Sequence, residues 1–284
     1  MPHLISLAAL VISKSKWSAE PLDFYSWRKT NLAGLENFLP VPLGQPSQAN
    51  RFSRYPVLTN LIGTAAFVKG AYQKKAGHLI AHHQKLFYVR IPKAASTSLG
   101  SEILKLITPD LKTETLTSAQ LNFLADAWLQ TSLSEPLKTF NGFTVVRNPV
   151  DRITSVYRDF FAPDSTKPFI YQNYLGGILP KTLSFDEFID RINRIPDRFK
   201  DQHFKPQHLF VKPYQTKGIN IRVFKLEEPG PLQQFLQPFG IILPHLNKSP
   251  QTTPVSIREN TLNTIKKMYA FDFEVYGYDQ NSAW

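Results

Sequence analysis

The sequence predicts an α/β fold in which a central, mainly parallel sheet is flanked by helices. Residues 86–91 and 139–146 have the β-branched and aromatic composition of strands, and each run is followed by a short turn and by apolar residues at helical spacing. Alternation of strands and helices is typical of parallel sheets. The second run ends in Thr144-Val145-Val146, which suits a sheet covered on both faces.

The chain is long enough for one large α/β domain with an extension. It has 284 residues, of which 42% are hydrophobic. Residues 39–56 contain four prolines and Gly44, so this stretch cannot form one helix or a central strand. We therefore expect an irregular N-terminal extension over residues 1–80 and the α/β domain over residues 81–284.

Charge and composition restrict the partners. The formal net charge of +11 favours polyanionic partners, among which nucleic acid, a nucleotide, an acidic polysaccharide and an anionic membrane all qualify. There is no cysteine, which excludes disulfides, cysteine-ligated zinc and thiol catalysis. The seven histidines show no metal-ligand spacing, so we expect no metal.

The N-terminus contains a short apolar run over residues 4–12. It is far shorter than the roughly 20 residues that a transmembrane helix needs. A signal peptide would need a basic region before this run, but only Pro2 and His3 follow the initiator methionine. We therefore expect a cytoplasmic protein without a transmembrane span, and secretion or peripheral membrane attachment through this run is the alternative.

The loop after the first strand has the character of an anion site. Between the strand and Leu99, where the helical spacing begins, the chain reads Lys93, Ala94, Ala95, Ser96, Thr97, Ser98. Backbone N–H groups at a helix start are unpaired and partly positive, so they bind phosphate or sulfate. The loop differs from the usual nucleoside triphosphate loop, because Lys93 comes first and no glycine lies between Pro92 and Leu99.

The second strand leads into another helix start. Asn148 is a good N-cap, Pro149 suits the first helical position, and Asp151 completes a start that resembles a capping box. Arg147 then lies at the carboxyl end of the strand and Ser155 about two turns into the helix. Ligands of open α/β sheets bind outside the carboxyl ends of the strands, where Lys93 and Arg147 both fall.

The remaining predicted helices and strands continue the alternation of strand and helix along the chain. A helix over residues 118–130 precedes the second strand, and the Ser184–Glu187 capping box opens a helix that ends before Pro196. A strand over residues 219–227 and helices over residues 232–239 and 257–268 follow.

Both loops resemble the signatures of sulfotransferases. Residues 92–98 match P-K-x-x-x-[ST]-S, and residues 147–157 match R-[DN]-P-x-x-R-x-x-S-x-Y. The resemblance implies a three-layer fold like that of P-loop NTPases and the donor 3′-phosphoadenosine 5′-phosphosulfate (PAPS), with 3′-phosphoadenosine 5′-phosphate as product. It also implies that the loop from Ala94 to Ser98 holds the 5′-phosphosulfate, that Lys93 neutralises charge on the bridging oxygen, and that Thr97 and Ser98 bind the 5′-phosphate. Arg147 and Ser155 would bind the 3′-phosphate.

A third segment resembles the carbohydrate sulfotransferase branch, sulfotransferase family 2. His203 to Gln207 matches its H-x-x-P-Q element, in which the histidine is a candidate general base. An unperturbed histidine pKa of about 6.5 suits that role. His208 and Glu227 are the alternative bases. Residues 244–249 resemble a segment near the donor, which makes Lys248 a candidate donor contact.

The resemblance therefore implies a sulfotransferase that moves a sulfuryl group from PAPS to a hydroxyl by in-line displacement. The expected acceptor is a carbohydrate or another hydroxyl compound, which can be acidic, and no nucleic-acid partner is expected. Two other classes stay open. A nucleotide kinase or NTPase on a related fold would depend on magnesium, and a non-catalytic polyanion-binding protein would bind without Lys93 and Arg147.

Overall fold

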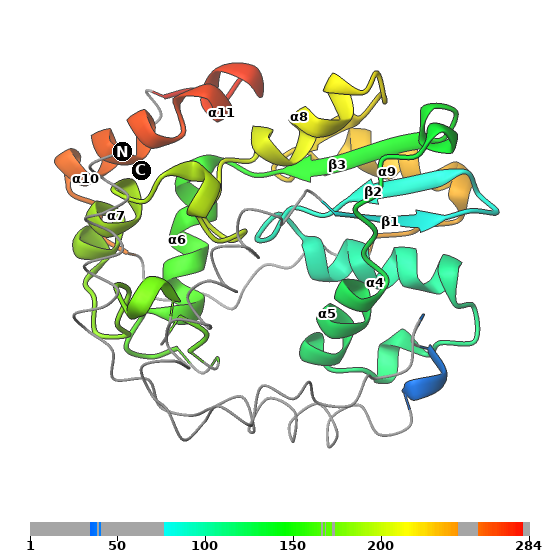
Figure 1. Cartoon of the computed structure of the whole chain (residues 1–284), viewed down its shortest axis with the longest axis horizontal. Coiled ribbons are helices and arrows are strands. Elements are labelled where there is room, and N and C mark those ends of the chain that lie inside the picture. Colours follow the sequence, from blue (N-terminus) through cyan, green and yellow to red (C-terminus); the bar gives the residue numbers. More distant parts are fainter. Residues whose placement is uncertain are drawn as a thin grey trace.

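The computed structural model describes residues 35–38, 40, 77–165, 167, 169–171, 174–243 and 255–280. Within these residues a four-stranded sheet has the order β1-β2-β3-β4, with bounds His78–Ala81, Leu86–Val89, Asn141–Val146 and Arg222–Lys225. β1 pairs antiparallel with β2, whereas β2 with β3 and β3 with β4 are parallel pairs. This mainly parallel sheet, flanked by helices, confirms the predicted fold class (Figure 1).

Helices alternate with the strands. The α-helices are α4 Ser96–Ile107, α5 Ser118–Ala127, α6 Pro149–Phe160, α7 Phe185–Asn193, α8 His208–Thr216, α9 Pro229–Leu236, α10 Glu259–Met268 and α11 Ala270–Val275. Short 3-10 helices are η1 Glu36–Phe38, η3 Thr113–Thr115, η4 Glu135–Lys138, η5 Tyr174–Gly176, η6 Asp197–Phe199 and η7 Gln237–Phe239. The sequence did not predict α8, because Pro213 inside it reads as a helix breaker.

Aromatic side chains attach helices to both faces of the sheet. Adjacent residues of a strand point to opposite faces. Phe87 of β2 stacks on Tyr214 of α8, with 6.1 Å between ring centroids. Tyr88, the next residue, stacks on Phe143 of β3, which in turn contacts Phe235 of α9. The sheet is therefore covered on both faces, as the β-branched end of β3 predicted.

The apolar core has two parts. One surrounds the sheet together with α4, α5, α8 and α9, and the other lies among α6, α7 and α10. The carboxyl ends of β2 and β3 point toward α6, at the junction between these two parts (Figure 1). No helix within the described ranges is long and apolar enough to cross a membrane.

The sheet begins earlier than the sequence predicted. Residues 78–80 were assigned to the N-terminal extension, but they form most of β1 at the edge of the sheet. An earlier fragment also packs on the domain, because Leu35 is buried and the indole N–H of Trp128 donates to the Phe38 carbonyl oxygen at 2.8 Å. The rest of the proline-containing stretch, from residue 41, lies outside the described residues.

The caps of two helices show which local predictions hold. α6 begins at Pro149, and the Asn148 side chain accepts from the Val150 N–H at 2.9 Å. The predicted capping box with Asp151 is wrong, because the Asn148 N–H donates to Glu227 at 2.7 Å. A carboxylate from a distant strand end takes the place of the local one. In α7 the Ser184 capping box forms as predicted.

Candidate active site

The turn between β2 and α4 has a backbone suited to an anion. Lys93 and Ala95 have φ angles of 68° and 57°, in the left-handed region that residues other than glycine rarely adopt. Ala95 is the N-cap of α4, and its methyl group cannot accept a hydrogen bond from the first turn. The Ala95 side chain therefore satisfies none of the first-turn N–H groups, and the helix dipole adds positive potential.

Lys93 is held by α6. Its Nζ forms an ion pair with Asp159, which also pairs with Lys167, and it lies 5.9 Å from the centroid of the Phe160 ring. The Lys93 side chain is only 13% exposed. Burial lowers the pKa of Lys93 to about 8, and Asp159 offsets part of this shift. Lys93 is therefore a cation that can lose its proton just above neutral pH.

The Thr97 hydroxyl of this loop already has a hydrogen-bond partner in the protein. The Thr97 hydroxyl donates to Asn122 of α5 at 3.0 Å, and the same Asn122 oxygen accepts from Arg90 at 2.6 Å. Ala94, the first residue after Lys93 in the loop, is buried. The expected contact between the Thr97 hydroxyl and a phosphate would thus require the hydroxyl to leave Asn122.

Arg147 lies beside this loop. It follows β3 directly, and its charge contributes to the lowering of the Lys93 pKa. The Gln207 side chain accepts from the Arg147 N–H at 2.9 Å and donates to its carbonyl oxygen at 2.8 Å. Ser155 is half-buried on α6, one turn before Asp159, the partner of Lys93. The structure therefore brings the two predicted phosphate-binding segments together at α6.

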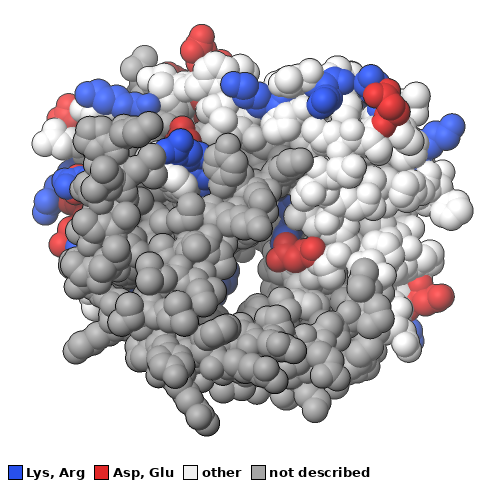
Figure 2. Space-filling model, in the orientation of Figure 1, with Lys and Arg blue, Asp and Glu red and all other residues white. Residues whose placement is uncertain are grey.

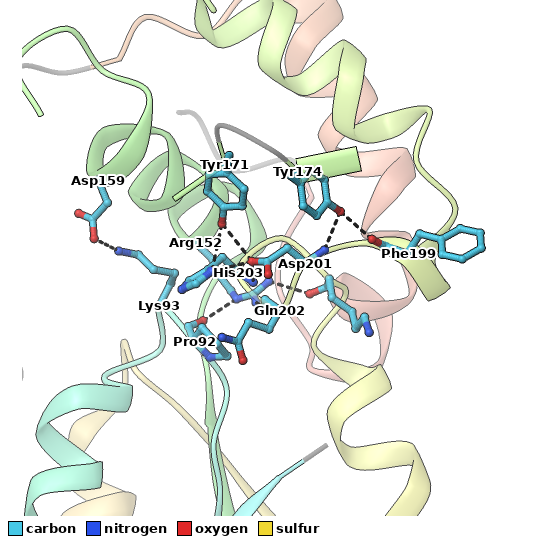
Figure 3. A network of polar contacts seen from close by, with 11 residues as sticks. Pro92, Lys93, Arg152, Asp159, Tyr171, Tyr174, Phe199, Asp201, Gln202 and His203 are labelled. Atoms are coloured by element: carbon cyan, nitrogen blue, oxygen red, sulfur yellow. Dashed lines mark hydrogen bonds and ion pairs between the residues drawn. The ribbon is translucent and has the colours of Figure 1, made fainter. Parts of the chain in front are cut away.

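His203 is oriented by a carboxylate. Its Nδ1 lies 2.6 Å from Asp201 Oδ1, and its backbone N–H donates to the same oxygen at 3.0 Å. The Tyr171 hydroxyl donates to that oxygen at 3.0 Å, and burial raises the Tyr171 pKa well above its ordinary value (Figure 3). With Tyr171 as donor, Asp201 is best satisfied when Nδ1 carries the imidazole proton. Nε2 is then the basic nitrogen.

Arg152 connects the lysine loop to the histidine loop. Its side chain is buried and donates to three backbone carbonyl groups, those of Pro92 at 3.0 Å and of Lys205 and Gln202 at 2.9 Å each. Pro92 directly precedes Lys93, and Gln202 directly precedes His203 (Figure 3). Lys205 follows His203 by two residues. One guanidinium on α6 therefore fixes both loops relative to each other.

The two alternative bases also have defined contacts. His208 Nδ1 lies 2.7 Å from the buried carboxylate of Asp272, which is the same arrangement as that of His203 with Asp201, so this contact does not exclude His208 as a base. Both oxygens of Glu227 accept hydrogen bonds, one from the Asn148 N–H at 2.7 Å and the other from the Tyr278 hydroxyl at 2.9 Å. These bonds occupy one acceptor position on each oxygen and hold the Glu227 carboxylate between the start of α6 and Tyr278.

Two further expectations concern Lys248 and metal binding. Lys248 lies outside the described residues. Across the part of the chain that the structure describes, His, Asp and Glu side chains form no group of three that could hold a metal ion.

Sequence reasoning missed the carboxylates that surround the site. Asp159, Asp201 and Asp272 each contact a residue that the sequence singled out. Only Asp201 had a local signal, because it lies two residues before His203. The partners of Asp159 and Asp272 are distant in the sequence, and no spacing pattern marks such pairs.

Anion-binding loops at the ends of parallel strands are typical of enzymes that transfer phosphoryl or sulfuryl groups. Comparison with known families places the chain within this class. The sulfotransferase family matches residues 77–229, which is more than half of the chain. The protein belongs to the sulfotransferase family. No curated protein and no solved structure matches the chain.

Proposed function

We propose that the protein transfers the sulfuryl group of PAPS to a hydroxyl of a carbohydrate. Membership of the sulfotransferase family supports sulfuryl transfer as the reaction. The observation that carries the proposal is the convergence of three segments on α6. Asp159 pairs with Lys93, Arg147 lies two residues before the first residue of the helix, and Arg152 binds the loop that contains His203.

The residues at the strand ends fit the anionic groups of PAPS. The first-turn N–H groups of α4 and the Lys93 ammonium would hold the 5′-phosphate, since the N-cap Ala95 does not use these N–H groups. Arg147 and Ser155 would hold the 3′-phosphate. A guanidinium suits this role because its donors can bind two phosphate oxygens at once.

The donor supplies an activated sulfuryl group, whose bond to the bridging phosphate oxygen breaks as the acceptor oxygen bonds to sulfur. Lys93 would stabilise the charge that develops on the phosphate oxygen. His203 would take the acceptor proton at Nε2, because Asp201 keeps the other proton on Nδ1. Arg152 would keep the two residues in place while this occurs.

The carbohydrate acceptor is supported by the likeness of His203 to Gln207 to the carbohydrate branch. The net charge of +11 suits an acceptor that is itself acidic. Figure 2 shows Lys and Arg side chains along the upper edge of one face, with Asp and Glu side chains among them. On the described part of this face the basic side chains are thus interspersed with acidic ones.

Calorimetric binding of 3′-phosphoadenosine 5′-phosphate, with ATP as competitor, tests the donor. We expect the wild type to bind, ATP to compete poorly, and Arg147→Ala to weaken binding about ten- to a hundredfold, as for the loss of one charged contact. Arg194→Ala is the matched control, because Arg194 is the C-cap of α7, its side chain is 74% exposed, and it pairs with Asp190 four residues earlier.

The outcomes separate the rival functions. ATP binding that depends on magnesium would favour a kinase or NTPase. Polyanion binding that Arg147→Ala and Lys93→Ala leave unchanged would favour a binding protein. If the donor class holds, transfer of labelled sulfate from PAPS to desulfated polysaccharides tests the acceptor, and a protein that sulfates only small alcohols or tyrosine peptides would contradict the carbohydrate proposal.

A further inference from the structure

The backbone of Arg147 is held by a side chain where the sheet ends. Val146 is the last residue of β3, and its carbonyl oxygen accepts from the Leu226 N–H at 2.8 Å. One residue later, the Gln207 amide binds both the N–H and the carbonyl oxygen of Arg147, at 2.9 and 2.8 Å. Gln207 is completely buried. It therefore extends the strand pairing by one residue and fixes the peptide groups from which the Arg147 side chain extends.

Gln207 is itself held from the C-terminal part of the chain. Its backbone N–H donates to Asp272 Oδ2 at 2.6 Å, and the His208 N–H donates to Asp272 Oδ1 at 2.9 Å. Asp272 belongs to α11 and is completely buried. This carboxylate binds the N-terminal end of α8, so α11 sets the position of Gln207.

Glu227 forms a second connection, between the backbone of Asn148 and the C-terminal part of the chain. The Asn148 N–H donates to Glu227 Oε1 at 2.7 Å, and the Tyr278 hydroxyl donates to Glu227 Oε2 at 2.9 Å. Burial, followed by the Glu227 charge, raises the pKa of Tyr278, so the phenol keeps its proton and acts as the donor. The two peptide units that flank the Cα of Arg147 are thus held by Gln207, and the second of them also by Glu227.

Both connections end outside the family match. The match covers residues 77–229, whereas Asp272 and Tyr278 follow it. We propose that Gln207 and Glu227 are positioning residues for Arg147, and that Asp272 and Tyr278 of the C-terminal segment hold them in place for binding of the donor's 3′-phosphate. This inference rests on the proposed function, because it assigns Arg147 to that phosphate. A bidentate phosphate contact depends on the direction of the guanidinium, which its backbone sets.

The test is a double-mutant cycle with 3′-phosphoadenosine 5′-phosphate as the probe. Gln207→Met has a similar length but lacks the amide, and we expect it to weaken binding about three- to tenfold, as for the loss of hydrogen bonds that act through another group. In the Arg147→Ala background we expect the same substitution to have no further effect. A purely structural role would weaken binding equally in both backgrounds and would overturn the proposal.

A second variant keeps the proposal testable if Gln207→Met does not fold. Tyr278→Phe removes only the phenolic oxygen that binds Glu227. We expect it to weaken binding about two- to fivefold, and again only when Arg147 is present. Tyr276→Phe is the matched control, because Tyr276 precedes the same turn and no hydrogen bond of its hydroxyl is seen among the described residues.

The results for this inference and for the proposed function are distinguishable. If the wild type binds the probe and both Gln207→Met and Tyr278→Phe bind it equally well, the inference is overturned and the donor assignment stands. If the wild type does not bind the probe, the donor assignment fails and the inference fails with it.

Discussion

Arg152 Nε donates to the carbonyl oxygen of Pro92 at 3.0 Å, so α6 holds the residue directly before Lys93. The same guanidinium binds the loop on both sides of His203. A buried arginine thus connects two residues that are proposed to act at opposite ends of the transferred sulfuryl group. Burial lowers the pKa of Arg152, but a guanidinium stays protonated in proteins and keeps its donors.

Replacement of Arg152 by Met should destabilise the protein strongly. Three backbone carbonyl groups would lose their donor, and each buried group left without a partner costs about 1–3 kcal/mol. We expect the free energy of unfolding, measured by urea denaturation, to fall by about 3 kcal/mol or more. Arg194→Met, at the exposed C-cap of α7, should change the free energy of unfolding by less than about 0.5 kcal/mol. Equal unfolding midpoints for the two variants would show that Arg152 does not hold the loops together.

Binding of 3′-phosphoadenosine 5′-phosphate should weaken as pH rises through about 8, which is the pKa of Lys93. Below this pH Lys93 is protonated in the free protein and attracts the phosphate, whereas above it the ligand must bind a neutral amine or restore the proton. Phosphate monoesters are fully ionised above about pH 7, so the ligand does not titrate in this window. Calorimetry between pH 7 and about 9.5 should show an affinity loss of about tenfold.

Two variants test the assignment of this pH dependence. Lys93→Arg stays charged throughout the range and should give a flat profile. Asp159 raises the Lys93 pKa against the effect of burial, so Asp159→Asn should move the loss of affinity to lower pH. A wild-type profile that the arginine variant reproduces would mean that another group titrates.

The sequence predicted the site where local chemistry determines it. A strand end, a run of small residues and a helix start within a few positions predicted the Lys93 loop, and the Asn148-Pro149 cap predicted the start of α6. These signals act between neighbouring residues, and therefore a single sequence displays them. Residues 78–80 gave no comparable signal, because a four-residue edge strand is too short for a clear period.

The contacts that complete the site are long-range. Asp151 has the right type and spacing for a capping box, but Glu227 binds the Asn148 N–H instead. The glutamate reaches this position because β4 pairs with β3 and ends beside it. Asp159 and Arg152 were likewise visible as residues of a helix, but their partners depend on how α6 packs against two loops. Tertiary packing decides such contacts, and sequence spacing does not report it.

Asp201→Asn should lower the turnover number for sulfate transfer while donor affinity stays the same. The carboxylate keeps the Nδ1 proton of His203 in place, and an amide could present its N–H to this nitrogen and favour the wrong tautomer. A positioned general base contributes about a hundred- to ten-thousandfold, so we expect a loss of about ten- to a hundredfold. Steady-state kinetics with labelled PAPS would measure it. Asp190→Asn is the control, because Asp190 on α7 is 56% exposed. A loss of donor affinity in Asp201→Asn would instead indicate a general disturbance of the loop.

The left-handed backbone conformation of Ala95 should be required for phosphate binding by the loop between β2 and α4. Its φ of 57° is accessible to glycine without strain, so Ala95→Gly should bind the donor product within about twofold of the wild type. Ala95→Val places a β-branched side chain in the same region, where strain of about 1–3 kcal/mol is expected. The valine variant can relieve this strain by leaving the left-handed conformation, which would turn the first-turn N–H groups of α4 away from the phosphate. We therefore expect calorimetry to show a large loss of affinity for the valine variant alone, with Ala127→Val in α5 as the control. Equal binding by the valine and glycine variants would mean that the left-handed turn is not required for the phosphate.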